Sequence, residues 1–152
     1  MPQTHSPSDA TPRFALPFLY AGQAQKEFTV NQAHALTDML LHPAIEGVAH
    51  TPPQDAMDGA IWLVGTGATG DWEDYDDTLA GRQAGVWVHA QPQPGMRVYD
   101  KAAAQTLVYA DGWYRPLAPS APTGGEVIDS QMRDAFAELI ETLANAGILS
   151  GN

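Results

Sequence analysis

Six amide or charged side chains crowd the stretch AGQAQKEFTVNQ, Ala21 to Gln32, of this 152-residue chain. Such groups can bind a polar ligand or hold a neighbouring chain by hydrogen bonds. Thr29 followed by Gln32 also fits the capping box with which helices begin, in which each side chain satisfies a free backbone amide of the other. No catalytic arrangement is recognisable in the remainder. We therefore expect a partner or oligomer contact at Gln23, Gln25, Lys26 and Glu27.

The stretch GTGATG, Gly65 to Gly70, fits the G-x-G-x-x-G pattern of dinucleotide-binding loops. In that motif a helix follows directly, and its N-terminus binds the pyrophosphate. Here DWEDYDD follows, with no helical period and with five acidic residues that would repel phosphate. The glycines therefore predict a hairpin or bulged loop, and we expect no nucleotide cofactor.

The acidic run from Asp71 to Asp77 offers oxygen ligands of the kind that calcium prefers. It lacks the central glycine and the distant glutamate of a helix-loop-helix calcium site, so a solvated acidic loop is favoured over a weak cation site or a contact with a basic partner. The five histidines lack the spacing of a zinc site, and no serine lies in a nucleophile elbow. We expect no metal, no cofactor and no enzymatic activity; a glycan-cleaving enzyme is the least favoured function.

Tryptophan and tyrosine recur through the middle of the chain. Their rings can stack on sugars, but small β-domains also use them to fill thin cores, which is the favoured interpretation. Trp72 lies among acidic residues and is expected to be the most exposed of them. The candidate glycan contacts are Trp72, Tyr75 and Trp113.

The composition excludes several classes of partner. Asp and Glu number 18 against 7 Lys and Arg, for a formal net charge of −11, so nucleic-acid backbones and anionic membranes would repel the chain. There is no cysteine, which excludes disulfides and thiolate metal sites. No apolar run approaches the roughly 20 residues of a membrane span. We expect a protein made in the cytoplasm and not bound to a membrane.

The chain divides into four segments by composition. Residues 1–13 predict a flexible arm, residues 14–117 a helix plus a Trp-rich β domain, residues 118–125 a Pro/Gly linker, and residues 126–152 a C-terminal helix. The predicted fold class is α+β, a small antiparallel β-meander with a capped N-terminal helix and a coiled-coil-like C-terminal helix. The expected strands are 60–65, 86–90, 96–100, 105–110 and 113–117.

The N-terminal helix is expected to run from Val30 to about Leu41 and to stop before Pro43. Thr29 would be its cap, and Phe28 would contact Ala33 across the cap as a hydrophobic staple. Its buried positions would be Ala33, Leu36 and Leu40.

The C-terminal helix has an apolar seam with spacings of four, three, four and three, which is typical of a coiled coil. Gly147 and Ile148 predict the cap that ends it. Two heptads are too short to hold a lone helix in water, so the seam must dock on the domain or on copies of itself. The seam residues are Met132, Phe136, Leu139, Leu143 and Ala146.

Three stretches together resemble one family: LPFLYAGQAQKEFTVNQAHALTDMLL, then DGAIWLVGTGATGDW, then the Gly-Trp strands ending VYADGWYRPL. They are similar to an uncharacterised-domain family of alphaproteobacterial prophages and gene transfer agents. The resemblance covers residues 14 to 117, and its most specific part is Gly22 to Glu27. The N-terminal arm and the C-terminal helix lie outside it.

Members of that family look like virion appendage proteins, and some are head spikes that decorate capsid vertices and help bind the host's polysaccharide capsule. The resemblance implies a non-enzymatic structural protein on the surface of a virion or gene transfer agent particle, most simply the base of a head spike. It implies a homo-oligomer, with a pentamer favoured at a capsid vertex, in contact with capsid protein and a separate spike fibre. The alternative is a carbohydrate-binding module or tail-fibre component that contacts host capsular polysaccharide.

Overall fold

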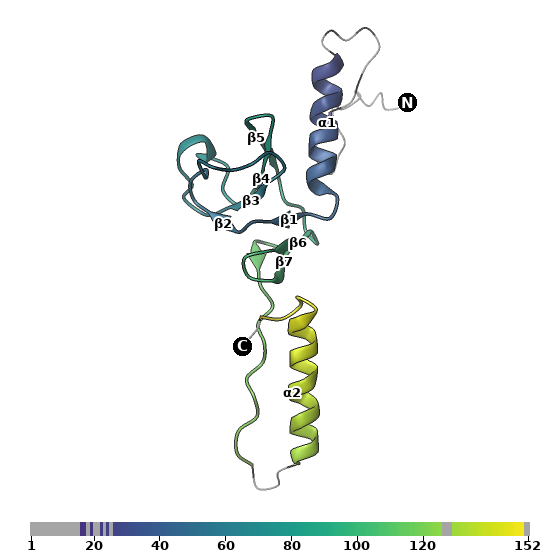
Figure 1. Ribbon diagram of the computed structural model, residues 1–152, viewed down its shortest axis with the longest axis vertical. Coiled ribbons are helices and arrows are strands. Elements are labelled where there is room, and N and C mark those ends of the chain that lie inside the picture. Colours follow the sequence, from purple (N-terminus) through teal and green to yellow (C-terminus); the bar gives the residue numbers. More distant parts are fainter. Residues whose placement is uncertain are drawn as a thin grey trace, which may run out of the picture.

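A computed structural model describes Leu16, Pro17, Leu19, Gly22, Ala24 and residues 26–125 and 129–150. The predicted arm at 1–13 and two of the predicted contact residues, Gln23 and Gln25, lie outside the described residues. Within the described part, eight strands lie between two α-helices, which occupy opposite ends of the long axis (Figure 1). The predicted α+β class, with a helix on either side of an antiparallel-rich β region, is confirmed.

Helix α1 spans Lys26–Leu40, so it begins earlier than the capping box predicted. Thr29 and Gln32 lie inside the helix, and the predicted cap and its staple are wrong. Lysine and glutamate are good helix formers, and an acidic residue in the first turn opposes the partial positive charge of the helix N-terminus, so a start at Lys26 and Glu27 needs no threonine cap.

The end of α1 agrees with the prediction. His42 adopts a positive φ of 51°, and Pro43 cannot continue a helix. Leu36 is buried as expected, while Ala33 and Leu40 are only half-buried and Met39 is buried instead. The helix packs on the β region through this C-terminal half.

The strands form two four-stranded sheets. The first has the order β1-β6-β7-β8, formed by Ala44–Ile45, Arg97–Asp100, Gln105–Tyr109 and Trp113–Tyr114. The second has the order β2-β3-β4-β5, formed by Val48–Ala49, Ile61–Val64, Leu79–Gln83 and Val86–Ala90. A short 3-10 helix, η1 (Gly70–Trp72), lies in the long connection from β3 to β4.

All five predicted strands are present, but three further strands divide the β region into two sheets. Strands β1 and β2 are consecutive in the chain and belong to different sheets, each in a parallel pair. The segment joining them connects the two sheets by hydrogen bonds. Glu46 N donates to Ile61 O of β3 at 2.8 Å, and Lys101 N donates to Ile45 O of β1 at 2.9 Å. Strand β4 lies between β3 and β5, which the meander prediction made direct neighbours.

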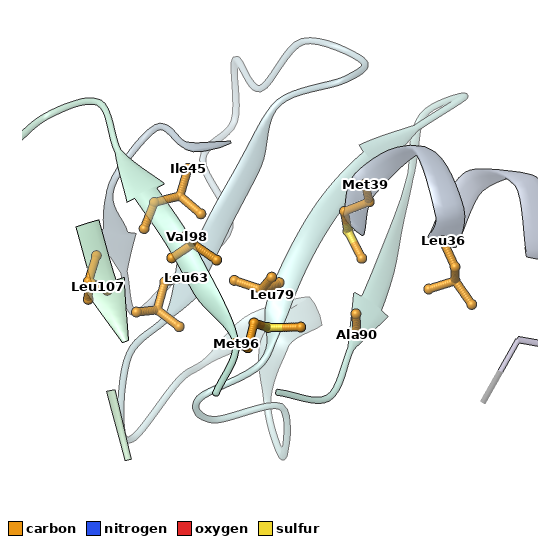
Figure 2. Packing of buried hydrophobic residues seen from close by; sticks show 9 residues of the cluster. All are labelled: Leu36, Met39, Ile45, Leu63, Leu79, Ala90, Met96, Val98 and Leu107. Atoms are coloured by element: carbon orange, nitrogen blue, oxygen red, sulfur yellow. The ribbon is translucent and has the colours of Figure 1, made fainter. Parts of the chain in front are cut away.

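The main core lies between the two sheets and under α1 (Figure 2). Leu36 and Met39 reach down from α1 toward Leu79 and Ala90 of the second sheet. Gly81 permits this approach, because a Cβ there would lie 2.6 Å from Met39 Sδ. The remaining buried members are Ile45, Leu63, Met96, Val98 and Leu107.

A second, smaller cluster lies around Trp72, which is fully buried with Val64, Ala68 and Ala80. Its ring meets that of Trp87 edge to face, with centroids 4.9 Å apart. The expectation that Trp72 would be the most exposed aromatic is therefore wrong. The 3-10 turn of η1 directs its side chain inward although its sequence neighbours are acidic.

Candidate functional site

The most distinctive surface belongs to a C-terminal hairpin. We define it as the extended strap of residues 116–125, which has no regular secondary structure, and helix α2 (Ser130–Asn145), which runs beside it away from the sheets (Figure 1). The helix begins at Asp129, whose side chain accepts a hydrogen bond from Met132 N at 2.9 Å. This is an N-terminal cap of the usual kind.

A C-terminal cap ends α2 at Gly147 and Ile148, as predicted, and its hydrogen bonds are those of a Schellman motif. Gly147 has a φ of 69°. Its amide donates to Ala144 O at 2.8 Å, and the amide of Ile148 donates to Leu143 O at 2.9 Å. These bonds fix the direction in which the chain leaves the helix.

The hairpin is tied to the first sheet at its near end. Thr106 N, in β7, donates to Gly147 O at 2.7 Å. Gln105 Nε2 donates to Pro116 O at 2.6 Å, and Ser150 N donates to the same carbonyl at 3.1 Å. Helix and strap therefore leave the β region from one anchored base.

The far end of the hairpin is held by one side chain. Arg133 donates through Nη1 to Pro122 O at 3.1 Å and through Nη2 to Gly124 O. The strap thus stays alongside α2 over most of the length of the helix.

No residue of α2 is buried, although the helix has a broad apolar side. Of the predicted seam, Met132 is 67% and Leu139 53% exposed, while Phe136 and Leu143 are half-buried. Ile140 and Ala144 were not among the predicted seam residues, but they widen the apolar side of the helix toward the strap. The sequence pattern could have indicated them, since each directly follows a seam position and is apolar. The strap covers that half and leaves Met132 and Leu139 uncovered.

The polar residues at the start of α1 are separated from this seam. Lys26 and Glu27 are exposed in the first turn of α1, at the end of the molecule opposite to α2 (Figure 1). Neither forms an ion pair with another residue of the described part of the chain. Their contact with a partner chain stays a prediction.

The three candidate glycan contacts do not form one surface. Trp72 is buried. Tyr75 is 41% exposed, and its ring stacks on His89 with centroids 3.8 Å apart. Trp113 is half-buried, and its Nε1 donates to Asp77 O at 2.8 Å, which ties the two sheets together.

Trp113 does line an open cleft between the edges of the two sheets. The cleft has a volume of about 290 Å³ and lies where edge strand β2 faces edge strand β8. Leu63 and Leu107 contribute to its apolar lining, and Tyr114, which is 51% exposed, forms part of its wall. The sequence analysis did not identify His50, Tyr114 and Arg115 as neighbours of Trp113 here.

The acidic loop has a structural acid in it. Asp76 Oδ2 accepts from Gly67 N at 2.7 Å, and Oδ1 accepts from Ala68 N at 2.9 Å. As predicted, GTGATG is a loop and not the start of an α-helix. In residues 26–125 and 129–150, no three His, Asp or Glu side chains are grouped so that they could hold a metal ion.

The imidazole of His89 is half-buried beside Tyr75 and Thr78. Burial lowers the pKa of its imidazole below the ordinary value of 6.5. Thr78 Oγ1 donates to Tyr75 O at 2.7 Å, so its oxygen is left to accept from His89 Nδ1, which is 3.1 Å away. In the neutral ring this arrangement therefore places the proton on Nδ1.

Comparison with known proteins gives a family. The family described as protein of unknown function (DUF2793) matches residues 30–115, more than half of the chain. This chain belongs to that family. The match runs from Val30 in α1 to Arg115, directly after β8, so it begins after the segment Gly22 to Glu27 that was the most specific part of the resemblance.

The comparison with curated proteins gives no match for the chain. The C-terminal hairpin lies beyond the matched residues. In the described residues, neither helix is long and apolar enough to cross a membrane.

Proposed function

We propose that this DUF2793 protein is a non-enzymatic structural component of a phage-like or gene transfer agent particle. It would form the base of a head spike at the capsid vertices, made in the bacterial cytoplasm and assembled onto the particle surface. The observation that carries the proposal is the C-terminal hairpin, which holds Met132 and Leu139 in solvent on an anchored, projecting helix. Exposed apolar seams of this kind are typical of subunit contacts.

The family resemblance supplies the biological setting of the proposal, and the charge is compatible with it. A net charge of −11 would oppose direct contact with packaged nucleic acid, whereas a protein on the outside of a particle does not contact it. A rotationally symmetric ring at a vertex would be a pentamer in contact with capsid protein below and a separate fibre above.

Localisation in intact particles tests this function directly. Particles purified from a strain that produces a tagged chain should retain the tag through density centrifugation, and cryo-EM should place it at the vertices. Particles from a strain without the protein should contain DNA and adsorb less well to host cells. A tag that stays wholly in the soluble fraction, with unchanged particles in the deletion strain, would refute the proposal.

The inter-sheet cleft favours a second candidate function, carbohydrate binding. Trp113 and Tyr114 place aromatic rings beside polar groups of His50 and Arg115, a combination that suits a sugar ring. Binding of host capsular polysaccharide should then fall at least tenfold in Tyr114→Ala. Tyr75→Ala is the matched control, because that ring lies outside the cleft lining. Equal binding by both variants, or none by the unaltered protein, would exclude the cleft.

A further inference from the structure

A groove of about 810 Å³ lies between α2 and its own strap. One wall is the apolar side of α2 and the other is the proline-containing strap. Its principal lining residues are Pro119, Pro122, Phe136, Ala137, Ile140 and Ala144. We call this the strap groove. The polar residues Ser120, Arg133, Glu141 and Asn145 also line it. An open groove with this much apolar lining, next to exposed apolar side chains, is typical of a contact between proteins.

The same helix presents a ridge next to this groove. Met132 and Leu139 are the large apolar side chains of α2 that are more than half exposed. At about 100° per residue they lie within roughly 20° of each other around the helix. Measured in the same way around the helix axis, the residues of α2 that line the groove are centred roughly 100 to 130° away from the ridge. Ridge and groove are thus adjacent but face in different directions.

We propose that the Met132 and Leu139 ridge of one copy enters the strap groove of the next, so that parallel copies close into a ring. This inference rests on the proposed homo-oligomer and names its contact surface. In a rotationally symmetric ring every copy lies at the same height, so a ridge can enter only a groove at its own level. Leu139 and Ile140 satisfy this condition, because consecutive residues differ in height by only about 1.5 Å.

Charge also favours a second copy as the occupant. Asp134 and Glu138 lie on the side of α2 away from the ridge, at the helical spacing of about 100° per residue. The outer neighbours of the ridge are the uncharged Gln131, Ala135 and Thr142. The ridge therefore brings no carboxylate of its own into the contact, and the groove that receives it carries one acid, Glu141, together with one base, Arg133.

The angle between ridge and groove limits the number of copies. In a ring of parallel helices, the directions to the two neighbours differ by about 60° for three copies, about 90° for four and about 108° for five. A separation of roughly 100 to 130° fits rings of about five to seven copies and excludes a two-fold or three-fold arrangement of the same surfaces. The pentamer of the proposed function lies within this range.

Disulfide cross-linking tests the contact, since the chain has no cysteine of its own. We expect the double variant Leu139→Cys with Ala137→Cys to give, on mild oxidation, a ladder that ends at the ring size. These positions lie about 160° apart on one helix, so they cannot pair within a chain. Each single variant should stay unlinked, and mixing the two single variants should give linked pairs. Leu139→Cys with Glu138→Cys, which puts the second cysteine outside the groove lining, is the matched control and should give no ladder.

Solution mass separates failure of this contact from failure of the proposed function. The unaltered protein should be a ring by light scattering, and Leu139→Ser should raise its dissociation constant at least tenfold while Glu138→Gln leaves it unchanged. Both variants should fold, because α2 contributes no residue to either buried cluster. If Leu139→Cys alone links into dimers, copies meet by a symmetric seam, and the groove contact is wrong while the oligomer stands. A monomer at all concentrations, with no links in any variant, overturns both.

Discussion

The carboxylate of Asp76 accepts a hydrogen bond from the backbone amide of Gly67 at 2.7 Å. The amide of Ala68 donates to the other carboxylate oxygen at 2.9 Å. Glycine-rich loops use such amides to bind phosphate. Here an acid nine residues further along the same loop satisfies them, so the loop is closed by its own chain and the dinucleotide pattern has a structural explanation.

Replacing Asp76 should therefore destabilise the fold in a pH-dependent way. The amides of Gly67 and Ala68 hold the pKa of this carboxyl below its usual value of 3.8. A lowered pKa contributes stability above the unfolded value, which is lost as the pH falls through the folded value. Asp76→Ala should lower the melting temperature at pH 7 and show a smaller further loss on acidification below about pH 4.

Glu73→Ala is the control for Asp76, because Glu73 is exposed in the same loop and no hydrogen bond to its carboxylate is seen within the described residues. Thermal unfolding between pH 7 and pH 3 measures both variants. A control that melts as low as Asp76→Ala would contradict the role given to the two amides.

The pair of Asp100 and Arg115 should be the most sensitive ion pair of the described chain. The Asp100 side chain is only 2% exposed and also accepts from Ala102 N at 2.9 Å and Ala103 N at 3.2 Å, so it shapes the turn from β6 to β7. Asp100→Ala leaves a partly buried guanidinium and two amides without an acceptor. We expect a loss of about 3 kcal/mol in the free energy of unfolding, measured by urea denaturation.

A matched exposed pair lies next to it in the sequence. Lys101 Nζ contacts Glu46 Oε1 at 2.6 Å, with side chains 50% and 37% exposed. Lys101→Ala should cost less than about 1 kcal/mol, because solvent screens such pairs. Equal losses in the two variants would show that burial does not distinguish them.

The parts of the fold that could be predicted are those marked by residues close together in the sequence, and the parts that could not depend on pairing between distant residues. The caps at Asp129 and Gly147 act within one helical turn, and Gly147 and Ile148 alone predicted a C-terminal cap there. Strands β1 and β2 are two residues each and pair in parallel with distant strands, so nothing local marks them. Strand β4 contains Gly81, which weakens a strand signal but is required beneath Met39.

The pH dependence of the stability of the fold should depend on His89. Burial lowers the pKa of this imidazole below 6.5, so the unfolded chain takes up a proton more readily than the folded one. Stability is then fully present above pH 6.5 and falls as the pH drops from 6.5 toward the lowered pKa. Urea midpoints at pH 7.5 and pH 5.5 should differ less in His89→Gln than in the unaltered protein. His34→Gln, on the exposed side of α1, should leave the difference unchanged.

Trp72 should be a stability residue and not a ligand contact. Its side chain is 0% exposed and packs against Trp87, so Trp72→Ala should cost about 3 to 5 kcal/mol of unfolding free energy. Tyr114→Ala, at a ring that is 51% exposed, should cost less than about 1 kcal/mol. Near-UV circular dichroism with urea titration measures both. A stable Trp72→Ala protein would mean that the ring is not part of the core.

The candidate site was predictable on one helix but not across elements. Spacing alone identified Met132 and Leu139, because a seam is a property of a single helix. The strap groove requires a second segment laid against that helix by Arg133, whose acceptors are backbone carbonyls and leave no trace in the residue types. Trp72 was misassigned for a related reason, since acidic neighbours describe the loop and not the direction of one side chain.

Gly147 should couple the β region to assembly. Its φ of 69° disfavours a side chain, and a Cβ there would lie 3.2 Å from a ring carbon of Tyr99 and 3.4 Å from Ala104 O. Gly147→Ala should cost about 1 kcal/mol or more at the junction and disturb the bond from Thr106 N, so that α2 leaves the sheet at a different angle. We therefore expect near-normal helicity by far-UV circular dichroism together with a smaller particle mass by light scattering.

Gly112→Ala is the control, because no atom lies within 4 Å of the added Cβ and its φ is not in the left-handed region. If Gly147→Ala assembled as well as Gly112→Ala, the direction set by the anchored base would not matter for the ring, and the level matching between Leu139 and Ile140 would lose its structural basis.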